Sequence, residues 1–217
     1  MILSALTTDS PSLPPVSKLV LASASPRRQD LLREAGAGFL VLVSDTDESA
    51  DPSLSARELV KLLSVRKAKD VATCWNELPE QILILAADTV VEAPDGRILG
   101  KPTDAEDAKA MLRSLSGELH HVYTGFTLLW RDGIYTEAVD TGIVFRTLTE
   151  EDIQWYIDSG EPFGKAGSYA IQGLGGGFVE ARSGDFTNVV GLPIPALQAA
   201  LQKLFGKSLS DFDVTAK

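Results

Sequence analysis

Residues 23–28 place two hydroxyl and two guanidinium groups between a short apolar run and a helix-like segment. Pro26 lacks an N–H and fits the first position of a helix, and Ser25 fits the N-cap. Such a junction directs free backbone N–H groups and the positive helix end to one point, which favours phosphate binding. A capped helix with exposed arginines explains the same residues, so both interpretations stay open.

Asp88 follows an apolar run of six residues, 82–87. Such a run is typical of a buried central strand, which places Asp88 at the carboxyl end, where open α/β sheets bind ligands. A carboxylate there can hold a divalent metal ion or orient a water molecule, or it can simply cap a turn. Glu48 ends the acidic string 45–48, which on its own is typical of a solvated loop.

Two lysines are further candidates. Lys67 stands on a predicted helix beside Arg66 and Lys69, where an exposed face is the ordinary explanation. Lys101 lies between a glycine and a proline. The backbone there is rigid and can come close to a ligand, which favours a ligand-binding role over a random surface charge.

Three other features are weaker. His120 and His121 are adjacent, so on a strand they point to opposite faces and cannot bind one metal together. The glycine-rich segment 173–177 neither follows the first strand nor opens a helix, so we interpret it as a flexible bend or lid rather than a dinucleotide site. Cys74 is the single cysteine, which excludes an intramolecular disulfide and favours a reducing compartment.

The composition of the 217-residue chain excludes several classes of protein. Apolar residues make up 44%, which is enough to offset the ordering entropy of folding. Thirty acidic against twenty basic residues give a net charge of −10, which argues against a general nucleic-acid binder but not against one small anion. No apolar stretch reaches the roughly 20 residues of a membrane-spanning helix. We therefore expect a cytoplasmic protein without nucleic-acid or membrane partners.

The elements that must position these residues alternate between strand and helix. Strands are predicted at 18–22, 39–44 and 82–87, and a hairpin at 121–130 and 134–145. Helices are predicted at 26–35, after Ser55, after a capping box at 103–106, at 150–159 behind Thr149, and at 195–205. The pattern predicts an α/β fold, a mixed twisted sheet flanked by helices. We expect one domain over 17–207, between a flexible tail at 1–16 and a C-terminal tail at 208–217.

In combination, the motifs resemble those of the Maf-type nucleoside triphosphate pyrophosphatases, relatives in fold of the inosine-triphosphate pyrophosphatases. The resemblance covers about 18–205 and implies an elongated fold with a central cleft. The matching segments are LASASPRRQDLL (21–32), DES (47–49), KA (67–68), AADTVV (86–91), GKP (100–102), LSG (115–117), YTG (123–125), EPFGKAGSYAIQGLGG (161–176) and NVVGLP (188–193).

The resemblance also implies roles for the candidate residues. The residues that would bind the triphosphate are Ser23, Arg28, Lys67 and Lys101. Asp88 corresponds to the general base, and Glu48 and Asp88 to the ligands of a divalent metal ion, Mg²⁺ or Mn²⁺. The implied reaction is attack of water at the α-phosphorus, which gives a nucleoside monophosphate and pyrophosphate. An unusual residue pattern before Lys67 leaves open whether Lys67 or Lys69 faces the phosphates.

Three positions linked to base choice in this family are Arg27, Thr89 and Gln172 here. They resemble the branch that hydrolyses dTTP and UTP rather than the branch that acts on 7-methyl-GTP. The Gln172 amide offers a donor and an acceptor, which suit the imide edge of uracil or thymine. The implied role is to remove unwanted nucleotides, modified pyrimidine nucleotides included, from the nucleotide pool. The resemblance is also compatible with a homodimer. The rival hypothesis is a nucleotide-binding regulator of cell division with little turnover.

Overall fold

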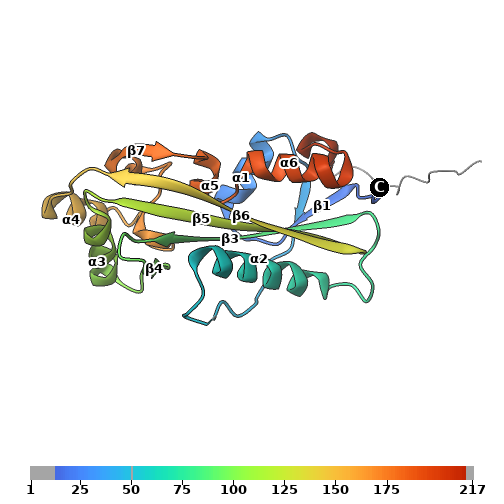
Figure 1. The fold of residues 1–217 in the computed structure, drawn as a ribbon, viewed down its shortest axis with the longest axis horizontal. Helices are drawn as coiled ribbons and strands as arrows, with labels where there is room; N and C mark the ends of the chain where they lie inside the picture. The colour runs from blue at the N-terminus through green and yellow to red at the C-terminus, as the bar shows by residue number, and fades with distance from the viewer. Residues whose placement is uncertain (1–12, 50, 214–217) are drawn as a thin grey trace, which may run out of the picture.

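A seven-stranded mixed sheet forms the long axis of the molecule, as Figure 1 shows. The computed structural model describes residues 13–49 and 51–213. The strands are β1 (Lys18–Leu21), β2 (Phe39–Val41), β3 (Ile82–Glu92), β4 (Ile98–Leu99), β5 (Leu119–Trp130), β6 (Gly133–Phe145) and β7 (Val179–Ser183). Their order is β2-β1-β3-β5-β6-β7, with β4 beside this path on β3. Because β1 pairs in parallel with β2 and β3 while the other pairs are antiparallel, the predicted mixed sheet and the predicted hairpin are confirmed.

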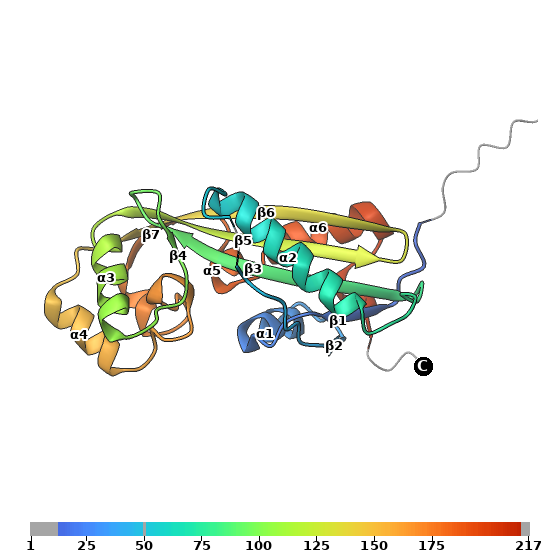
Figure 2. The same ribbon diagram turned by 90° about the horizontal axis from the view of Figure 1, so that it is seen from below.

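Helices cover both faces of this sheet (Figures 1 and 2). They are α1 (Pro26–Glu34), α2 (Ala56–Ala72), α3 (Ala105–Leu115), α4 (Glu150–Asp158), α5 (Phe186–Val190) and α6 (Ile194–Phe205), with short 3₁₀ helices η1 (Ala166–Ser168), η2 (Leu174–Phe178) and η3 (Leu209–Asp211). Helix α2 lies on one face, and α1, α5 and α6 lie on the other, while α3 and α4 gather at one end of the molecule. None of the helices in the described ranges is long and apolar enough to cross a membrane.

Two helix starts follow the predicted capping. The Ser55 hydroxyl accepts the Glu58 N–H, and the Glu58 carboxylate accepts the Ser55 N–H, which completes a capping box at the start of α2. Thr149 forms the same reciprocal pair with Asp152 at the start of α4. Each pair satisfies backbone donors that the first turn of a helix leaves free, so the sequence signal and the structure agree.

Two other predicted caps are wrong in detail. The N-cap of α3 is Asp104 rather than Thr103, and its carboxylate accepts the Asp107 N–H at 2.9 Å. The helix starts one residue later than predicted because Asp caps at least as well as Thr. Ser25 holds the N-cap position of α1 without a side-chain cap, and its N–H instead donates to the Ser23 hydroxyl at 3.2 Å.

Strand β3 is longer than the apolar run 82–87 predicts, because it continues to Glu92. One edge of β3 pairs with β5 along most of its length. The opposite edge pairs with β1 only as far as Leu85 and with β4 only from Val91. Asp88 therefore lies inside the strand rather than at its end, beside a stretch of edge that no described strand covers.

Helix α2 packs close to the sheet at Gly125 of β5. A Cβ atom at this position would lie 2.4 Å from the Val60 carbonyl oxygen of α2, so no side chain fits there. Gly125 is also the register partner of Asp88. The missing side chain thus lets α2 approach the strand pair and bring Lys67 over Asp88.

Two hydrophobic cores lie on the sheet face opposite α2. The first includes Leu21, Leu85, Leu197 and Phe205. The second includes Leu112, Phe145, Tyr156 and Phe178. Helix α5 stands between them, since Val190 belongs to the first core and Val189 packs against the second.

The first core extends past the domain boundaries that the sequence predicts. Val16 is buried in it at one end, and Leu209 and Phe212 are buried at the other. The C-terminal segment expected as a tail is therefore packed as far as Phe212. The rest of both expected tails, 1–12 and 214–217, lies outside the described residues.

Candidate active site

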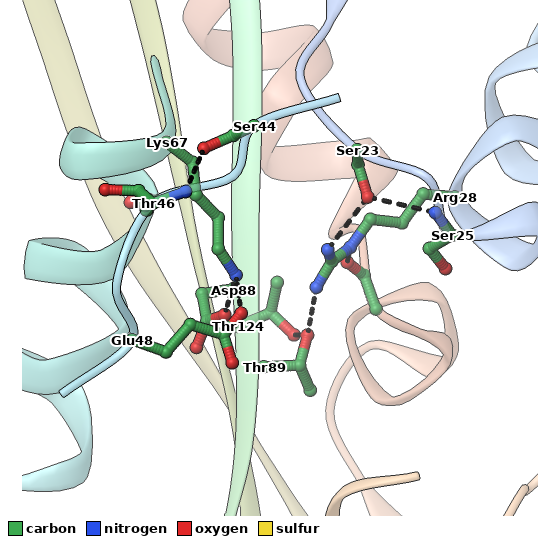
Figure 3. Close-up of polar contacts among 12 residues, drawn as sticks. Ser23, Ser25, Arg28, Ser44, Thr46, Glu48, Lys67, Asp88, Thr89 and Thr124 are labelled. Carbon is green, nitrogen blue, oxygen red and sulfur yellow. Dashed lines mark hydrogen bonds and ion pairs between the residues drawn. The ribbon is translucent and has the colours of Figure 1, made fainter. Parts of the chain in front are cut away.

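Three charged side chains meet over the uncovered edge of β3 (Figure 3). Lys67 of α2 donates to Oδ1 of Asp88 at 2.5 Å and lies 2.7 Å from Oε1 of Glu48, which belongs to the loop before α2. Lys67 and Asp88 are 13% and 11% exposed, whereas Glu48 is 52% exposed. The hydrogen bond from Lys67 lowers the pKa of the Glu48 carboxyl, against the opposing effect of its partial burial. Of the two lysines that the sequence left open, Lys67 is the one that lines the cleft.

Arg28 of α1 approaches the same part of β3 from the other face. Its guanidinium donates to the Gly191 carbonyl at 2.8 Å, to the Ser23 hydroxyl at 3.2 Å and to the Thr89 hydroxyl at 3.1 Å. Burial lowers the pKa of this guanidinium, and the negative charge of Asp88 opposes that effect. These bonds fix the orientation of Arg28, so it presents an oriented positive charge to the cleft.

Asp88 and Thr89 reach one cleft although they point to opposite faces of β3. Successive side chains of a strand alternate, so Asp88 faces α2 and Thr89 faces α1. Figure 3 shows Lys67 and Glu48 on one side of the strand and Arg28 on the other. Both sets meet because the strand edge between them is uncovered.

A chain of hydroxyl groups continues from Arg28 into the interior. The hydroxyl of Thr89 lies 2.9 Å from that of Thr124, which donates to the Asn188 carbonyl at 2.8 Å. Arg28 can only donate and a carbonyl can only accept, so every proton of the chain points from Arg28 toward Asn188. Asn188 is fully buried, and its amide nitrogen donates to the Val122 carbonyl at 2.9 Å.

The cleft around these residues has a volume of about 1330 Å³. Six Lys or Arg and four Asp or Glu line it, which leaves a formal charge of +2 in a chain of −10. The charged lining residues are Arg27, Arg28, Glu48, Asp51, Lys67, Asp88, Arg97, Lys101, Asp107 and Lys165. This local reversal of sign favours a small anion, while the acidic remainder repels an extended polyanion.

The remaining predicted residues also line this cleft. Lys101 is exposed in it, and its positive charge contributes to the low pKa of Glu48. Arg27 donates to the Val190 carbonyl at 3.4 Å, and Gln172 is exposed in the lining. Thr89 is bonded to Arg28, so its hydroxyl is already engaged.

Three polar residues of the site were not singled out by the sequence. Lys165 lines the cleft, and burial followed by the charge of Arg27 lowers its pKa. Like Lys101 it follows a glycine, which was an available signal. Thr124 and Asn188 lie inside the matching motifs YTG and NVVGLP, yet nothing local marks them as support for Arg28, because that role depends on contacts between distant segments.

Glu48 and Asp88 are the predicted metal ligands. Among the described residues, no group of three or more His, Cys, Asp and Glu is placed to hold a metal ion. Glu48 and Asp88 nevertheless converge on one ammonium group, so two carboxylates face a common point. Mg²⁺ often binds one or two carboxylates and completes its shell with phosphate oxygens and water, and this pair fits that donor set.

Comparison with known proteins matches the chain to a family model described as "Maf-like protein" over residues 18–204. A dTTP/UTP pyrophosphatase of Caldicellulosiruptor bescii is 44% identical over 87% of this chain and 96% of its own. A dTTP/UTP pyrophosphatase of Bacillus cytotoxicus is 45% identical over the same shares of the two chains. Among solved structures, the Staphylococcus aureus Ham1 protein aligns with a TM-score of 0.37 and 16% identity over 58% of this chain and 72% of that one.

Proposed function

Because this chain belongs to the Maf-like protein family, we propose that it is a nucleoside triphosphate pyrophosphatase that hydrolyses dTTP and UTP to the monophosphate and pyrophosphate. The observation that carries the proposal is the meeting of Arg28, Lys67, Asp88 and Glu48 at one uncovered strand edge. Similarity to relatives named dTTP/UTP pyrophosphatase supports the choice of substrates. The same similarity gives no support to the rival hypothesis of a regulator with little turnover.

The cations of the cleft would bind the triphosphate. Hydrolysis of a phosphoanhydride needs charge neutralisation and positioning more than covalent help from the protein. Arg28 is held by three hydrogen bonds, Ser23 is bonded to it, and Lys67 and Lys101 add positive charge beside Asp88 and Glu48. These four residues would hold the phosphates and stabilise the charge that leaves with pyrophosphate.

Asp88 would act as the general base. Its Oδ1 accepts from Lys67, and among the described residues its Oδ2 accepts no hydrogen bond. Oδ2 can therefore take a proton from the water molecule that attacks the α-phosphorus. Lys67 holds the carboxylate in place during this step.

Glu48 and Asp88 would bind a divalent metal ion, Mg²⁺ or Mn²⁺. When bound, the ion supplies further positive charge against the phosphate oxygens. The half-exposed Glu48 is able to exchange its contact with Lys67 for another cation, whereas Asp88 keeps its buried pair.

Arg27, Gln172 and Thr89 would determine the choice of base. In the described part of the chain the exposed Gln172 amide makes no hydrogen bond, so it can offer both its donor and its acceptor to the imide edge of a pyrimidine. Thr89 would act indirectly, because its hydroxyl is engaged by Arg28. A protein of this specificity would remove surplus or modified pyrimidine nucleotides from the nucleotide pool.

A nucleotide panel tests the proposal. Purified protein is supplied with dTTP, UTP, CTP, GTP and 7-methyl-GTP, with Mg²⁺ or Mn²⁺, and both monophosphate and pyrophosphate are measured. We expect equal amounts of the two products, the fastest turnover on dTTP and UTP, and loss of turnover in EDTA that added Mg²⁺ restores. Orthophosphate as the product would contradict the cleavage site, and binding without turnover would favour the regulator.

A further inference from the structure

The backbone just after Gln172 is bound by the carboxylate of Glu161. Oε2 of Glu161 accepts the Leu174 N–H at 3.0 Å, and Oε1 accepts the Gly175 N–H at 3.0 Å. Burial alone would raise the pKa of Glu161, but these backbone bonds, the hydrogen bond from Tyr156 and the charge of Lys165 together outweigh it, and the pKa is lowered. The carboxylate is therefore an ionised acceptor at neutral pH, and the glycine-rich segment expected as a flexible bend or lid forms η2 against it.

Tyr156 binds the backbone on the other side of Gln172. Its hydroxyl donates to Oε1 of Glu161 at 2.8 Å and accepts the Ala170 N–H at 3.1 Å. The Tyr156 side chain is fully buried in the second core. Tyr156 and Glu161 thus hold residues 170–175 at two points, with Gln172 between them.

The glycines of this segment stand where the two side chains touch it. A Cβ atom on Gly173 would lie 2.3 Å from Oε2 of Glu161, and one on Gly175 would lie 2.6 Å from the Tyr156 hydroxyl oxygen. Gly177 in the same segment has nothing within 4 Å of such an atom. The contacts, rather than general flexibility, explain the first two glycines.

Glu161 also holds a cation of the cleft. Its backbone carbonyl accepts from Nζ of Lys165 at 2.6 Å, and the Phe163 carbonyl lies 3.4 Å from the same nitrogen. Lys165 and Gln172 both line the cleft. Glu161 therefore fixes an ammonium donor through its main-chain carbonyl and the backbone just after Gln172 through its side chain.

We propose that Glu161, supported by Tyr156, is the positioning residue of the base-recognition side of the cleft. It holds the backbone of Gln172 so that the amide can contact a bound pyrimidine, and Lys165, which lines the same cleft, would donate to a ring carbonyl. This inference rests on the proposed function, because it takes the ligand to be a uracil or thymine nucleotide. A cytosine, which has an amino group in place of one carbonyl, would face the Lys165 ammonium with a donor.

The first test is Glu161→Ala. We expect KM for UTP to rise about tenfold, with kcat changed about twofold or less, and the preference for UTP over CTP in kcat/KM to fall about tenfold. The Ki of pyrophosphate as an inhibitor should stay within about twofold, since pyrophosphate contacts only the phosphate side. An equal loss for UTP and CTP, or a parallel rise in the Ki of pyrophosphate, would show a merely structural role and overturn the inference.

Gly173→Ala gives a second test with Glu161 in place, and Gly177→Ala is its matched control. The added methyl group at Gly173 must displace the segment or the carboxylate, whereas the one at Gly177 enters open space. We expect the first variant to reproduce the selectivity loss of Glu161→Ala and the second to match wild type. Identical selectivity of the two glycine variants would overturn the inference, even if Glu161→Ala fails to fold.

Hydrogen exchange separates this inference from the proposed function. We expect the amides of Leu174 and Gly175 to exchange at least about tenfold faster in Glu161→Ala than in wild type, and added UMP to protect them in wild type only. Unchanged exchange would overturn the positioning role. If wild type releases no pyrophosphate from UTP, the proposed function fails, and UMP protection still decides whether the positioned segment reads a pyrimidine.

Discussion

Lys67 neutralises two carboxylates that differ in their access to water. Its nitrogen lies within 2.7 Å of both Asp88 and Glu48, and Glu48 is much the more exposed. Without the ammonium, two negative groups would face each other and repel. Lys67 thus offsets the repulsion between the two carboxylates and holds Oδ1 of Asp88 in place.

At this residue scale we predict that Asp88→Asn lowers kcat for dTTP by about 10²- to 10⁴-fold, the usual contribution of a general base. Pyrophosphate release at saturating dTTP measures the effect. Asp51→Asn is the control, because Asp51 lines the same cleft and its carboxylate is bonded to Ser53 rather than to a cation. Unchanged pyrophosphate release in Asp88→Asn would refute the assigned base.

Thr89→Val removes one of the three acceptors of Arg28 and leaves the volume of the side chain almost unchanged. A hydrogen bond to a charged group contributes about 1.5–3 kcal/mol, so we expect kcat/KM for UTP to fall about 10- to 100-fold. Thr89→Ser keeps the hydroxyl and should retain most of the activity. Equal kcat/KM values for the Val and Ser variants would mean that the hydroxyl chain does not orient Arg28.

At the scale of elements, the distance between α2 and the β3–β5 pair decides where Lys67 stands. In Gly125→Ala, the new Cβ atom would press on the Val60 carbonyl, so the helix must move away. We expect a loss of about 1–3 kcal/mol in the free energy of unfolding, as for other overpacked contacts, together with a lower kcat.

Urea unfolding and steady-state kinetics check this expectation. Gly142→Ala in β6 is the matched control, because its Cβ atom would meet the flexible Leu119 side chain at 3.3 Å rather than a helix backbone. A Gly125→Ala variant with wild-type stability and kcat would show that α2 is not held by this contact.

Elements are predicted correctly where a local sequence rule is strong, and the prediction fails where an element depends on pairing between distant segments. The capping box of Ser55, the Thr149 cap and the β5–β6 hairpin are confirmed. The end of β3 is predicted too early, because pairing with β5 carries the strand past Asp88. The two-residue β4, five-residue β7 and five-residue α5 are too short to show a period, so they were not predicted.

The same limit applies to the site. Cations and carboxylates can be recognised by their type and spacing, and all the predicted site residues line the cleft. Glu161 shows the opposite case. Its importance depends on backbone amides 13 and 14 residues away, which no spacing rule identifies.

At the scale of the whole molecule, the second core contains a histidine. His120 is fully buried, bonded through Nε2 to the Tyr169 hydroxyl at 3.0 Å and packed edge-on against Phe145. Burial lowers the pKa of His120 to about 4. The folded protein therefore keeps this ring neutral down to about that pH, whereas the unfolded chain binds a proton near pH 6.5.

We predict from this that the folded state loses stability as pH falls from about 6.5 to about 4, because the unfolded state takes up the proton first. The shift corresponds to a loss on the order of 3 kcal/mol, fully recovered above pH 6.5. Urea unfolding at several pH values measures it. His120→Gln should remove this part of the slope. Equal slopes in this variant and in wild type would contradict the prediction.

The uncovered edge of β3 has a consequence for how the cleft responds to mutation. The Leu85 carbonyl accepts from the Ala22 N–H across to β1, so by alternation the peptide groups of Ala87 and Thr89 point to the same edge. Main-chain donors and acceptors survive every substitution except one by proline, which removes the N–H. We therefore expect that alanine substitutions throughout the cleft leave a residual affinity for nucleotide, because the main-chain N–H and C=O groups at this edge of β3 remain. Replacement of one of these amides by an ester should lower that residual affinity.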